Sequence, residues 1–472
     1  MSTLLLKDRN FTVRIPPLRL LLVIGVATSL SVGLPFDTTR AEEQKGQKGI
    51  YEPVELHKRE QHLVETANEL EGRFKRRGLR YREPETEQWL SRVASRIYPE
   101  PTDSYINYRV FLIRDPSPNA FALADGQIYI HTGMLARLQN ESQVAGLMAH
   151  EVNHVAGHHH VVAFRSARKK AIASMVLGSV LGGLGGDWGS LIAGIADVGF
   201  AMSVLGYSRQ LEEEADRRAV GLLRESGYDS AELPKIFDTM NNDPEGESPR
   251  IRAKWSTHPL LAERAAYLRG MIRLDPQETF TTPLISQDEY STLVLAIGLM
   301  TVEDYIHVDY PRTALFLAQR LAKQHPKDAR VFVALGDAWH ALGARSTLTP
   351  DQPLTEEEKK QSLRARRKFT RAEREAQRLD SREGRANLKN NMVSAKEAYL
   401  DALDIDGAIP EAYRGLGDAY SELFRYKDAA RAYLRYLKLA PDAPDRNSVH
   451  AQLKTLLAEI KRGTSHAKTQ PE

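Results

Sequence analysis

The segment from Leu147 to His160, LMAHEVNHVAGHHH, holds five of the 14 histidines of the 472-residue chain and one glutamate. His150 and His154 are four residues apart, so on a helix they lie roughly 40° apart around the axis and can bind one ion. Glu151 lies on the adjacent flank, from which a carboxylate reaches a water molecule on that ion. The spacing H-E-x-x-H therefore predicts zinc-assisted hydrolysis, in which Glu151 takes a proton from the water.

A third protein ligand is expected elsewhere, because a catalytic zinc usually has three protein ligands and one open position. The candidate segment is Ser208–Ala219, SRQLEEEADRRA, in which Glu212 and Asp216 are also four residues apart. One carboxylate of such a pair can bind the ion, while the other accepts a hydrogen bond from a ligating imidazole. The alternative interpretation is that this glutamate-rich run is only the charged surface of a helix.

The consecutive histidines His158, His159 and His160 complete the opening segment. Histidine-rich tracts are often merely solvent-exposed, so we expect these residues to form an exposed helix end. Of the three, His159 is the one most suited to help the site.

The composition narrows the possible functions. Lys and Arg (65) nearly balance Asp and Glu (62), and no region combines basic and aromatic residues as a nucleic-acid groove would, so no nucleic-acid partner is expected. The chain has no cysteine, which excludes thiol nucleophiles, disulfides and cysteine-based zinc sites. Any bound metal must therefore be held by histidines and carboxylates.

The N-terminus predicts export. Basic residues precede an uncharged apolar run from Leu20 to Gly33, and small residues follow, with Ala41 at a plausible cleavage point. This pattern is typical of a secretory signal peptide, here residues 1–41, followed by a polar linker over 42–52. The alternative is an uncleaved anchor, which would also place the rest of the chain outside the cytoplasm.

Short periodic segments surround the histidine motif. Apolar residues at helical spacing predict helices over Pro53–Phe74 and Thr86–Ile97, and β-branched and aromatic runs predict strands over Tyr108–Ile113 and Gly126–Gly133. The next helix has a capping residue in Asn140 or Ser142 and an apolar face made by Val144, Leu147, Met148 and Val152. The histidine motif is therefore expected on a buried helix.

The segment 171–207 is apolar and glycine-rich. Its longest charge-free run is marginal for spanning a bilayer, so we interpret it as a buried helical hairpin or a flap beside the active site. The alternative is a loop that makes peripheral contact with a membrane.

Residues 276–462 change in character to pairs of helices. From Tyr413, residues at fixed offsets fit the 34-residue tetratricopeptide pattern, namely Tyr413, Leu416, Gly417, Tyr420, Ala429, Tyr433 and Pro441. FVALGDAW, Phe332–Trp339, repeats the signature of YRGLGDAY, Tyr413–Tyr420. The charged run Thr355–Arg385 is most simply a solvated helix face, and alternatively a docking surface for an acidic partner. Residues 463–472 form a polar tail.

Together, HEVNH (His150–His154), the S-R-x-x-E-x-x-A-D series (Ser208–Asp216) and THPLLAER (Thr257–Arg264) resemble the zinc metalloprotease family that includes the CAAX prenyl proteases and HtpX. The order of signal peptide, protease and repeats is similar to that of the periplasmic BepA-type enzymes. The resemblance implies an α+β, mainly α fold: a zincin-type metalloprotease domain with a small β-sheet over 53–275, followed by an all-α tetratricopeptide-repeat domain.

The resemblance also implies roles for individual residues. His150, His154 and Glu212 would bind one zinc ion, Glu151 would be the general base, and Asp216 would support a ligating imidazole. Substrate would pair as an added strand with Asn119, Ala120 and Phe121. His258 and Arg264 would contact the oxyanion, or His258 would close the site as a further metal ligand; the plain alternative for His258 is a cap before Pro259.

Two departures from the family pattern concern the substrate cleft, not the ligands. Leu260 stands where a second proline is common, and Ala124-Asp125-Gly126 replaces a turn richer in glycine.

The leading hypothesis is an exported, periplasmic zinc endopeptidase that acts on unfolded or stalled envelope proteins in quality control of outer-membrane assembly. Its repeats would engage these proteins or the β-barrel assembly machinery. The alternative is a repeat-based periplasmic chaperone or adaptor with latent protease activity. An integral membrane protease would need longer apolar segments than this chain has.

Overall fold

The computed structural model describes residues 56, 58–101, 103–166, 207–241, 261–277, 280–281, 283–345 and 371–467. The expected signal peptide, its linker, nearly all of the glycine-rich segment, and His258 lie outside these residues.

The N-terminal part of the described chain combines helices with one small sheet, in the order α1 (Lys58–Arg76), β1 (Arg80–Tyr81), α2 (Pro84–Ile97), β2 (Arg109–Ile113), β3 (Ala120–Ala122) and β4 (Gln127–His131). The sheet order is β1-β2-β4-β3; β2 is parallel to β4, and the other two pairs are antiparallel. The two expected helices are confirmed as α1 and α2, and the two expected strands as β2 and β4.

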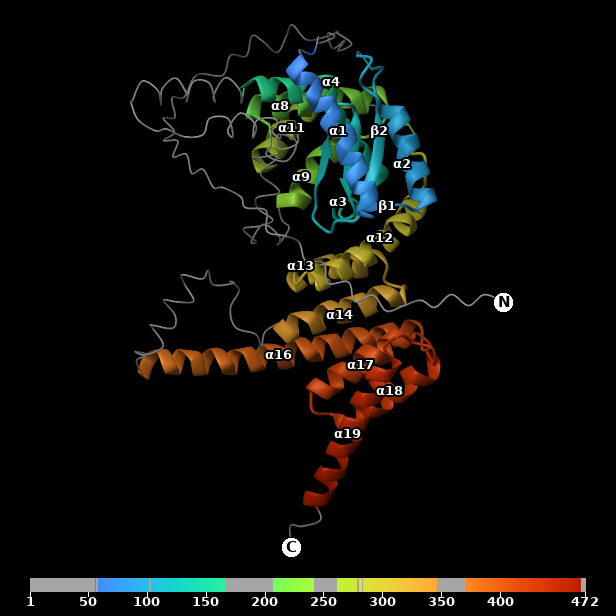
Figure 1. Cartoon of the computed structure of the whole chain (residues 1–472), viewed down its shortest axis with the longest axis vertical. Helices are drawn as coiled ribbons and strands as arrows, with labels where there is room; N and C mark the ends of the chain where they lie inside the picture. The colour runs from blue at the N-terminus through green and yellow to red at the C-terminus, as the bar shows by residue number, and fades with distance from the viewer. Residues whose placement is uncertain are drawn as a thin grey trace, which may run out of the picture. The chain divides into compact units, whose positions relative to one another are not determined.

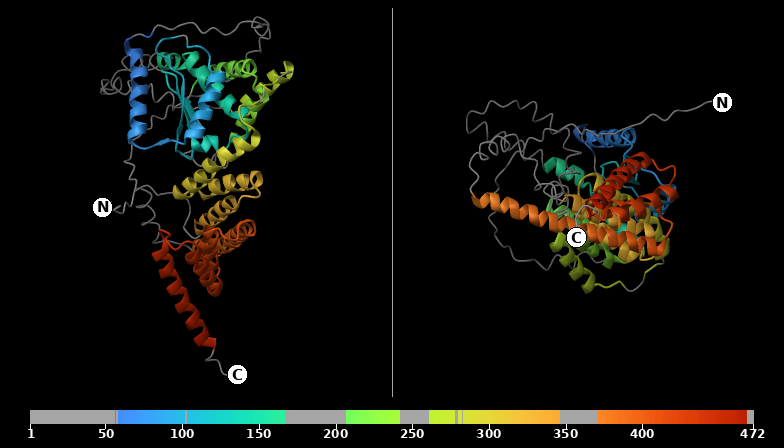
Figure 2. Two further views of the ribbon diagram at one scale, coloured as in Figure 1. Left: turned by 90° about the vertical axis from the view of Figure 1, so that its right-hand side faces the viewer. Right: turned by 90° about the horizontal axis from the view of Figure 1, so that it is seen from below.

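Helices cover both faces of this sheet, so strand β4 is buried at every position. Because side chains alternate along a strand, Ile128 and Ile130 of β4 face one core with α2 and α4, whereas Tyr129 faces a second core against α1. Figure 2 shows α1 on one side of the strands and the other helices on the opposite side. Strand β3 is the edge of the sheet on the side away from β1.

Within the described residues, the sheet is followed by the helices α3 (Thr132–Leu135), α4 (Glu141–Ala156), α8 (Arg209–Glu225), α9 (Leu233–Asn241) and α11 (Leu261–Leu274), with a short 3-10 turn, η2 (Ser230–Glu232), before α9. Residues 159–166 are also helical. Asn140 caps α4 by accepting a hydrogen bond from the Gln143 N–H at 2.9 Å, as the sequence predicts. All residues of α4 except Ser142 are buried. The expectation of a buried helix is therefore confirmed, but α4 is enclosed on every side.

The N-terminus of α4 is held by a buried carboxylate. Glu141 accepts hydrogen bonds from the Trp89 Nε1–H and the Tyr228 hydroxyl, both at 3.0 Å. It also accepts from the backbone N–H groups of Leu284 at 2.7 Å and Ile285 at 3.2 Å. The carboxylate thus ties α2, α4, the segment just after α8 and the segment before α12 together.

The C-terminal part is an array of helices: α12 (Gln287–His307), α13 (Pro311–Gln324), α14 (Ala329–Arg345), α16 (Arg371–Ile405), α17 (Pro410–Glu422), α18 (Tyr426–Leu439) and α19 (Arg446–Ala467). Helices that follow one another pack together through the array (Figure 1). The repeat signature has a packing role: a Cβ on Gly417 would lie 2.2 Å from Cε1 of Tyr433. The tetratricopeptide assignment itself stays a prediction, and α19 continues to Ala467, into the expected polar tail.

The hydrophobic core crosses the expected domain boundary between residues 275 and 276. One cluster of buried residues runs from Trp89 of α2 through α12 and α13 to Ala338 of α14. Trp89 packs edge-on against Tyr290 of α12, with ring centroids 5.6 Å apart. The buried guanidinium of Arg137 donates to the Tyr305 hydroxyl of α12 at 3.1 Å. The first helices of the array therefore close the core of the N-terminal part.

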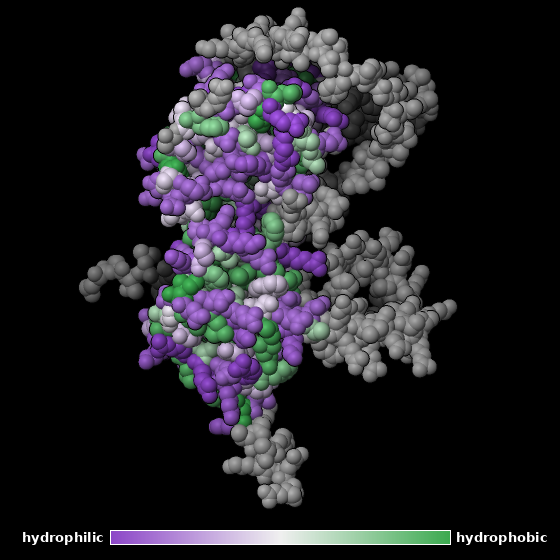
Figure 3. Space-filling model, turned by 180° about the vertical axis from the view of Figure 1, so that it is seen from behind, coloured by the Kyte–Doolittle hydropathy of each residue, from purple (hydrophilic) through white to green (hydrophobic). Residues whose placement is uncertain are grey.

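Within the described ranges, no helix is both long enough and apolar enough to span a membrane. On the face seen in Figure 3, hydrophilic residues predominate and apolar residues lie among them.

Candidate metal centre

Two helices that pack against each other bring together the side chains singled out by their spacing. Helix α4 carries His150, Glu151 and His154, and α8 carries Glu212 and Asp216. All five side chains are buried. The charged run Ser208–Ala219 is therefore not only a helix surface, because its two acidic residues at i and i+4 face α4.

The three expected ligands point at one another. The Nε2 atoms of His150 and His154 are 3.1 Å apart. The Glu212 carboxylate lies 3.5 Å from the first and 3.6 Å from the second. One ligand atom from each residue lies within 4.8 Å of the others, and this is the group that can hold a metal among the described residues. Two imidazoles and one carboxylate are a donor set that suits a catalytic zinc ion.

His150 is oriented by Asp216. Its Nδ1 atom lies 3.0 Å from Oδ1 of Asp216, which leaves Nε2 directed at the proposed ion. Burial acts to lower the pKa of His150, but hydrogen bonds to Asp216 and Glu212 outweigh it and raise the pKa to about 9. A metal ion that binds Nε2 must displace the proton held there.

Arg264 of α11 joins both carboxylates of α8. Its Nε and Nη2 atoms donate to Asp216 at 2.8 and 2.7 Å, and its Nη1 atom lies 2.8 Å from Oε2 of Glu212. Burial acts to raise the pKa of Asp216, but the Arg264 guanidinium holds it at about 2. Tyr267 also donates to Asp216. Arg264 therefore fixes the carboxylates, while its expected oxyanion contact stays a prediction.

His154 is oriented by a histidine instead of a carboxylate. Its Nδ1 atom lies 2.8 Å from Nδ1 of His159, and Nε2 of His159 lies 3.7 Å from Glu214. The ring of Tyr207 stacks on His154, with centroids 3.9 Å apart and an interplanar angle of 13°. Gly157 allows the ring of His159 to lie this close to the end of α4, because a Cβ at Gly157 would lie 2.6 Å from Nε2 of His159.

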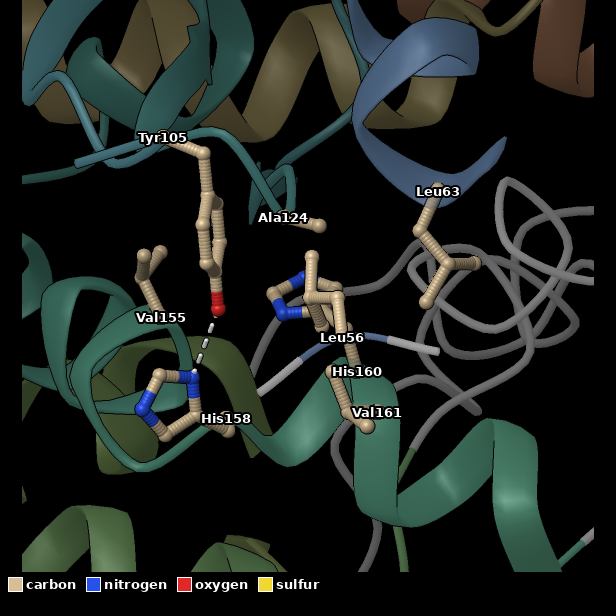
Figure 4. Close-up of a pocket in the computed structure, with 8 residues that line it drawn as sticks. All are labelled: Leu56, Leu63, Tyr105, Ala124, Val155, His158, His160 and Val161. Carbon is tan, nitrogen blue, oxygen red and sulfur yellow. Dashed lines mark hydrogen bonds between the residues drawn. The ribbon is translucent and has the colours of Figure 1, made fainter. Parts of the chain in front are cut away.

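The expectation of an exposed histidine tract was wrong, since His158, His159 and His160 are all buried. His158 has a positive φ of 52°, so the chain turns there, and the next residue, His159, contacts His154. His158 contacts the Tyr105 hydroxyl at 3.1 Å (Figure 4). The Nε2 atom of His160 lies 2.8 Å from the carbonyl oxygen of Ala122. The ring of His159 contacts the ring of the proposed ligand His154, in line with the expectation that His159 is the most suited of the three to help the site.

The expected substrate strand is β3 with the residue before it. Asn119 and Ala120 line a pocket together with His150 and Glu151. Phe121 pairs with Tyr129 of β4, and the two rings stack with centroids 5.3 Å apart. The side chain of Phe121 is thus a core residue, and a contact with substrate stays a prediction for all three positions.

Sequence reasoning missed Glu214, Tyr207 and Tyr267. Glu214 stands in the same acidic run as Glu212, where nothing in the spacing distinguishes a residue that pairs with a histidine from an exposed one. The two tyrosines adjoin the motifs at the start of α8 and within α11, but an aromatic residue near a helix end carries no signal of what it covers.

Comparison with known proteins agrees with this geometry. Residues 84–272 match the model of Peptidase family M48. The β-barrel assembly-enhancing protease of Escherichia coli is 28% identical over 191 residues, 40% of this chain and 39% of that protein. The mitochondrial metalloendopeptidase OMA1 of Schizosaccharomyces pombe is 29% identical over 38% of this chain and 51% of its own length. The metalloprotease YcaL of Escherichia coli is 26% identical over 39% of this chain and 68% of its own.

The chain thus spans about two fifths of the length of the β-barrel assembly-enhancing protease that it matches. Among solved structures, an IFIT1 mutant aligns with 70% of this chain at 13% identity, but its TM-score of 0.23 supports no conclusion. The matched region contains His150, His154, Glu212 and the side chains that orient them. Residues 84–272 are therefore a metallopeptidase domain of family M48, similar to that of the β-barrel assembly-enhancing proteases.

Proposed function

We propose that this protein is an exported zinc endopeptidase that hydrolyses peptide bonds of envelope proteins during the assembly of outer-membrane proteins. The observation that carries the proposal is the buried group of His150, His154 and Glu212, with Glu151 beside it on the same helix. The N-terminal pattern supports export to the periplasm, and the names of the similar proteases support the substrate class.

The residues divide the chemistry among them. A zinc ion held by His150, His154 and Glu212 would lower the pKa of a water molecule and polarise the scissile carbonyl. Glu151 would take the proton of the attacking water and pass it to the leaving amine. Asp216 and Arg264 keep the imidazole of His150 and the carboxylate of Glu212 in place, so that little reorganisation is needed when substrate binds.

The register of β3 supports an added substrate strand. The carbonyl of Asn119 accepts from the His131 N–H, and the Leu123 N–H donates to Gln127, so these alternate residues face β4. The backbone groups of Ala120 and Ala122 then face the other way. Of these, the Ala122 carbonyl contacts the ring of His160 at 2.8 Å. Ala120, next to Glu151 in the pocket, is the position at which substrate backbone would pair.

The helical array is proposed as the surface that engages unfolded or stalled envelope proteins, or the β-barrel assembly machinery, since stacked helix pairs form extended binding surfaces. Peripheral membrane contact through residues 171–207 is part of the same proposal. The alternative function is a periplasmic chaperone or adaptor with latent protease activity. The buried Glu151 beside a complete ligand set favours the enzyme, because an adaptor has no use for a base that activates water.

One experiment tests the proposal. Purified mature protein should contain about one zinc per chain and cleave an unfolded outer-membrane β-barrel protein, whereas Glu151→Gln should keep the zinc and not cleave. Stoichiometric zinc without cleavage, together with suppression of β-barrel aggregation by both proteins, would favour the chaperone.

A further inference from the structure

An apolar pocket adjoins the general base. His150 and Glu151 form part of its wall, and Asn119 and Ala120 of the β3 edge form another part. The rest of the lining is apolar and comes from the segment before β3 and from α3, α4, α9 and α11, namely Pro118, Met134, Leu147, Ile236, Phe237, Met240 and Leu261. The pocket therefore lies where a substrate strand paired with β3 would pass α4, the helix that carries His150 and His154.

The lining decides what the pocket accepts. Apart from His150 and Glu151, Asn119 is the one lining residue with a polar side chain. A charged or strongly polar substrate side chain would lose its water there and gain few hydrogen bonds in return. An aliphatic side chain loses no hydrogen bonds and buries its apolar surface. The pocket is thus suited to hydrophobic side chains.

The size of the pocket narrows the range of hydrophobic side chains that it can bind. Its volume is about 50 Å³, whereas a single water molecule needs roughly 10–15 Å³ of such space. A cavity of about 150 Å³ holds the six carbons of benzene, so this space takes roughly two carbon groups, such as the two terminal methyl groups of leucine or the Sδ and Cε atoms of methionine. The ring of phenylalanine is larger than this space, and most of the surrounding side chains are buried, which leaves them little room to move apart.

We propose that this pocket binds the side chain of the substrate residue next to the scissile bond and selects aliphatic residues of the size of leucine or methionine. The inference rests on the proposed peptidase function and adds a rule for where the enzyme cleaves. Segments of an unfolded chain that would be buried after folding are rich in such residues, so the pocket favours cleavage of unfolded over folded protein.

The test uses the full zinc-loaded chain and a series of peptides that differ at one residue. Leucine and methionine peptides should have a kcat/KM at least about tenfold higher than alanine or phenylalanine peptides and about a hundredfold higher than aspartate peptides. The same order should appear in the affinity of the Glu151→Gln variant, which binds without cleaving. Equal kcat/KM and equal affinity for all peptides would overturn the proposal.

A change of the pocket itself provides the second arm. Met240→Ala removes Cγ, Sδ and Cε, about the difference between a leucine and a phenylalanine side chain, and should shift the preference toward phenylalanine by about tenfold or more. Met271→Ala is the matched control, because Met271 packs against the same core but does not line the pocket. An equal shift in both variants, or none in Met240→Ala, contradicts the pocket assignment.

The outcomes separate this inference from the proposed function. Cleavage with no preference for aliphatic residues would refute the pocket assignment and leave the peptidase intact. Failure to cleave any peptide would refute the peptidase, while the affinities of Glu151→Gln would still decide what the pocket binds.

Discussion

The Nδ1 atom of His154 lies 2.8 Å from the Nδ1 atom of His159. Only one of two such nitrogens can carry the shared proton. If His154 binds an ion through Nε2, its Nδ1–H is the donor and His159 is the acceptor. The Nε2–H of His159 then faces Glu214, at 3.7 Å. The imidazole of His154 is thus oriented by another imidazole, whereas that of His150 is oriented by the carboxylate of Asp216.

We predict that His159→Ala weakens zinc binding by about ten- to a hundredfold, because the imidazole of His154 loses the group that fixes its orientation. His159→Asn should retain most of the affinity, since its amide oxygen takes the place of Nδ1. Competition with a chelator measures both values. His158→Ala removes a buried histidine that contacts Tyr105 instead, and an equal loss in that control would mean that His159 acts only through folding.

We predict that Glu151→Gln abolishes peptide hydrolysis and leaves zinc content and stability near those of the parent protein, because the amide keeps the shape but cannot accept the proton. Zinc analysis and a peptide cleavage assay measure the two properties. Cleavage by this variant at the parent rate would exclude Glu151 as the base.

We predict that Glu212→Ala loses most of the zinc, whereas Asp216→Asn weakens its binding by about ten- to a hundredfold. Glu213→Ala is the control, because Glu213 stands next to Glu212 but pairs with Arg217 on the surface of α8. Metal titration distinguishes the three variants. Full zinc retention in Glu212→Ala would transfer the ligand role to another residue.

We predict that Glu141→Ala lowers the free energy of unfolding by roughly 3–5 kcal/mol, because it leaves several buried donors without an acceptor. Trp89, Tyr228 and the backbone of Leu284 all donate to this carboxylate. Urea denaturation measures the change. The control Glu85→Ala, on the exposed start of α2, should change stability by less than about 1 kcal/mol.

Local patterns predicted the parts of the site that depend on one helix at a time. The spacing of four residues identified His150 with His154 and Glu212 with Asp216, because each pair lies on one helical face. Contacts between different helices and strands leave no such periodic spacing in the sequence. Arg264 gained its partners from the packing of α11 on α8, and the bonds of Glu141 join residues far apart in the chain.

The histidine tract shows why composition alone can mislead. Three adjacent histidines are typical of an exposed terminus, but the chain turns at the positive φ of His158, and the next residue contacts His154 instead of solvent. The neighbouring Gly157 permits the contact that gives His159 its place beside the ligand. Such a turn depends on the packing around it, which the sequence does not display.

The core that passes from Trp89 into α12 and on to Ala338 has a consequence for how the molecule denatures. Because Tyr290 and Tyr305 complete the packing of the N-terminal part, the metallopeptidase and the first helices of the array should melt in one cooperative transition. A chain cut after residue 275 would expose an apolar surface and lose the donors that hold Glu141 from Leu284 and Ile285. In evolution, these first helices could be exchanged for others only together with the peptidase surface that they cover.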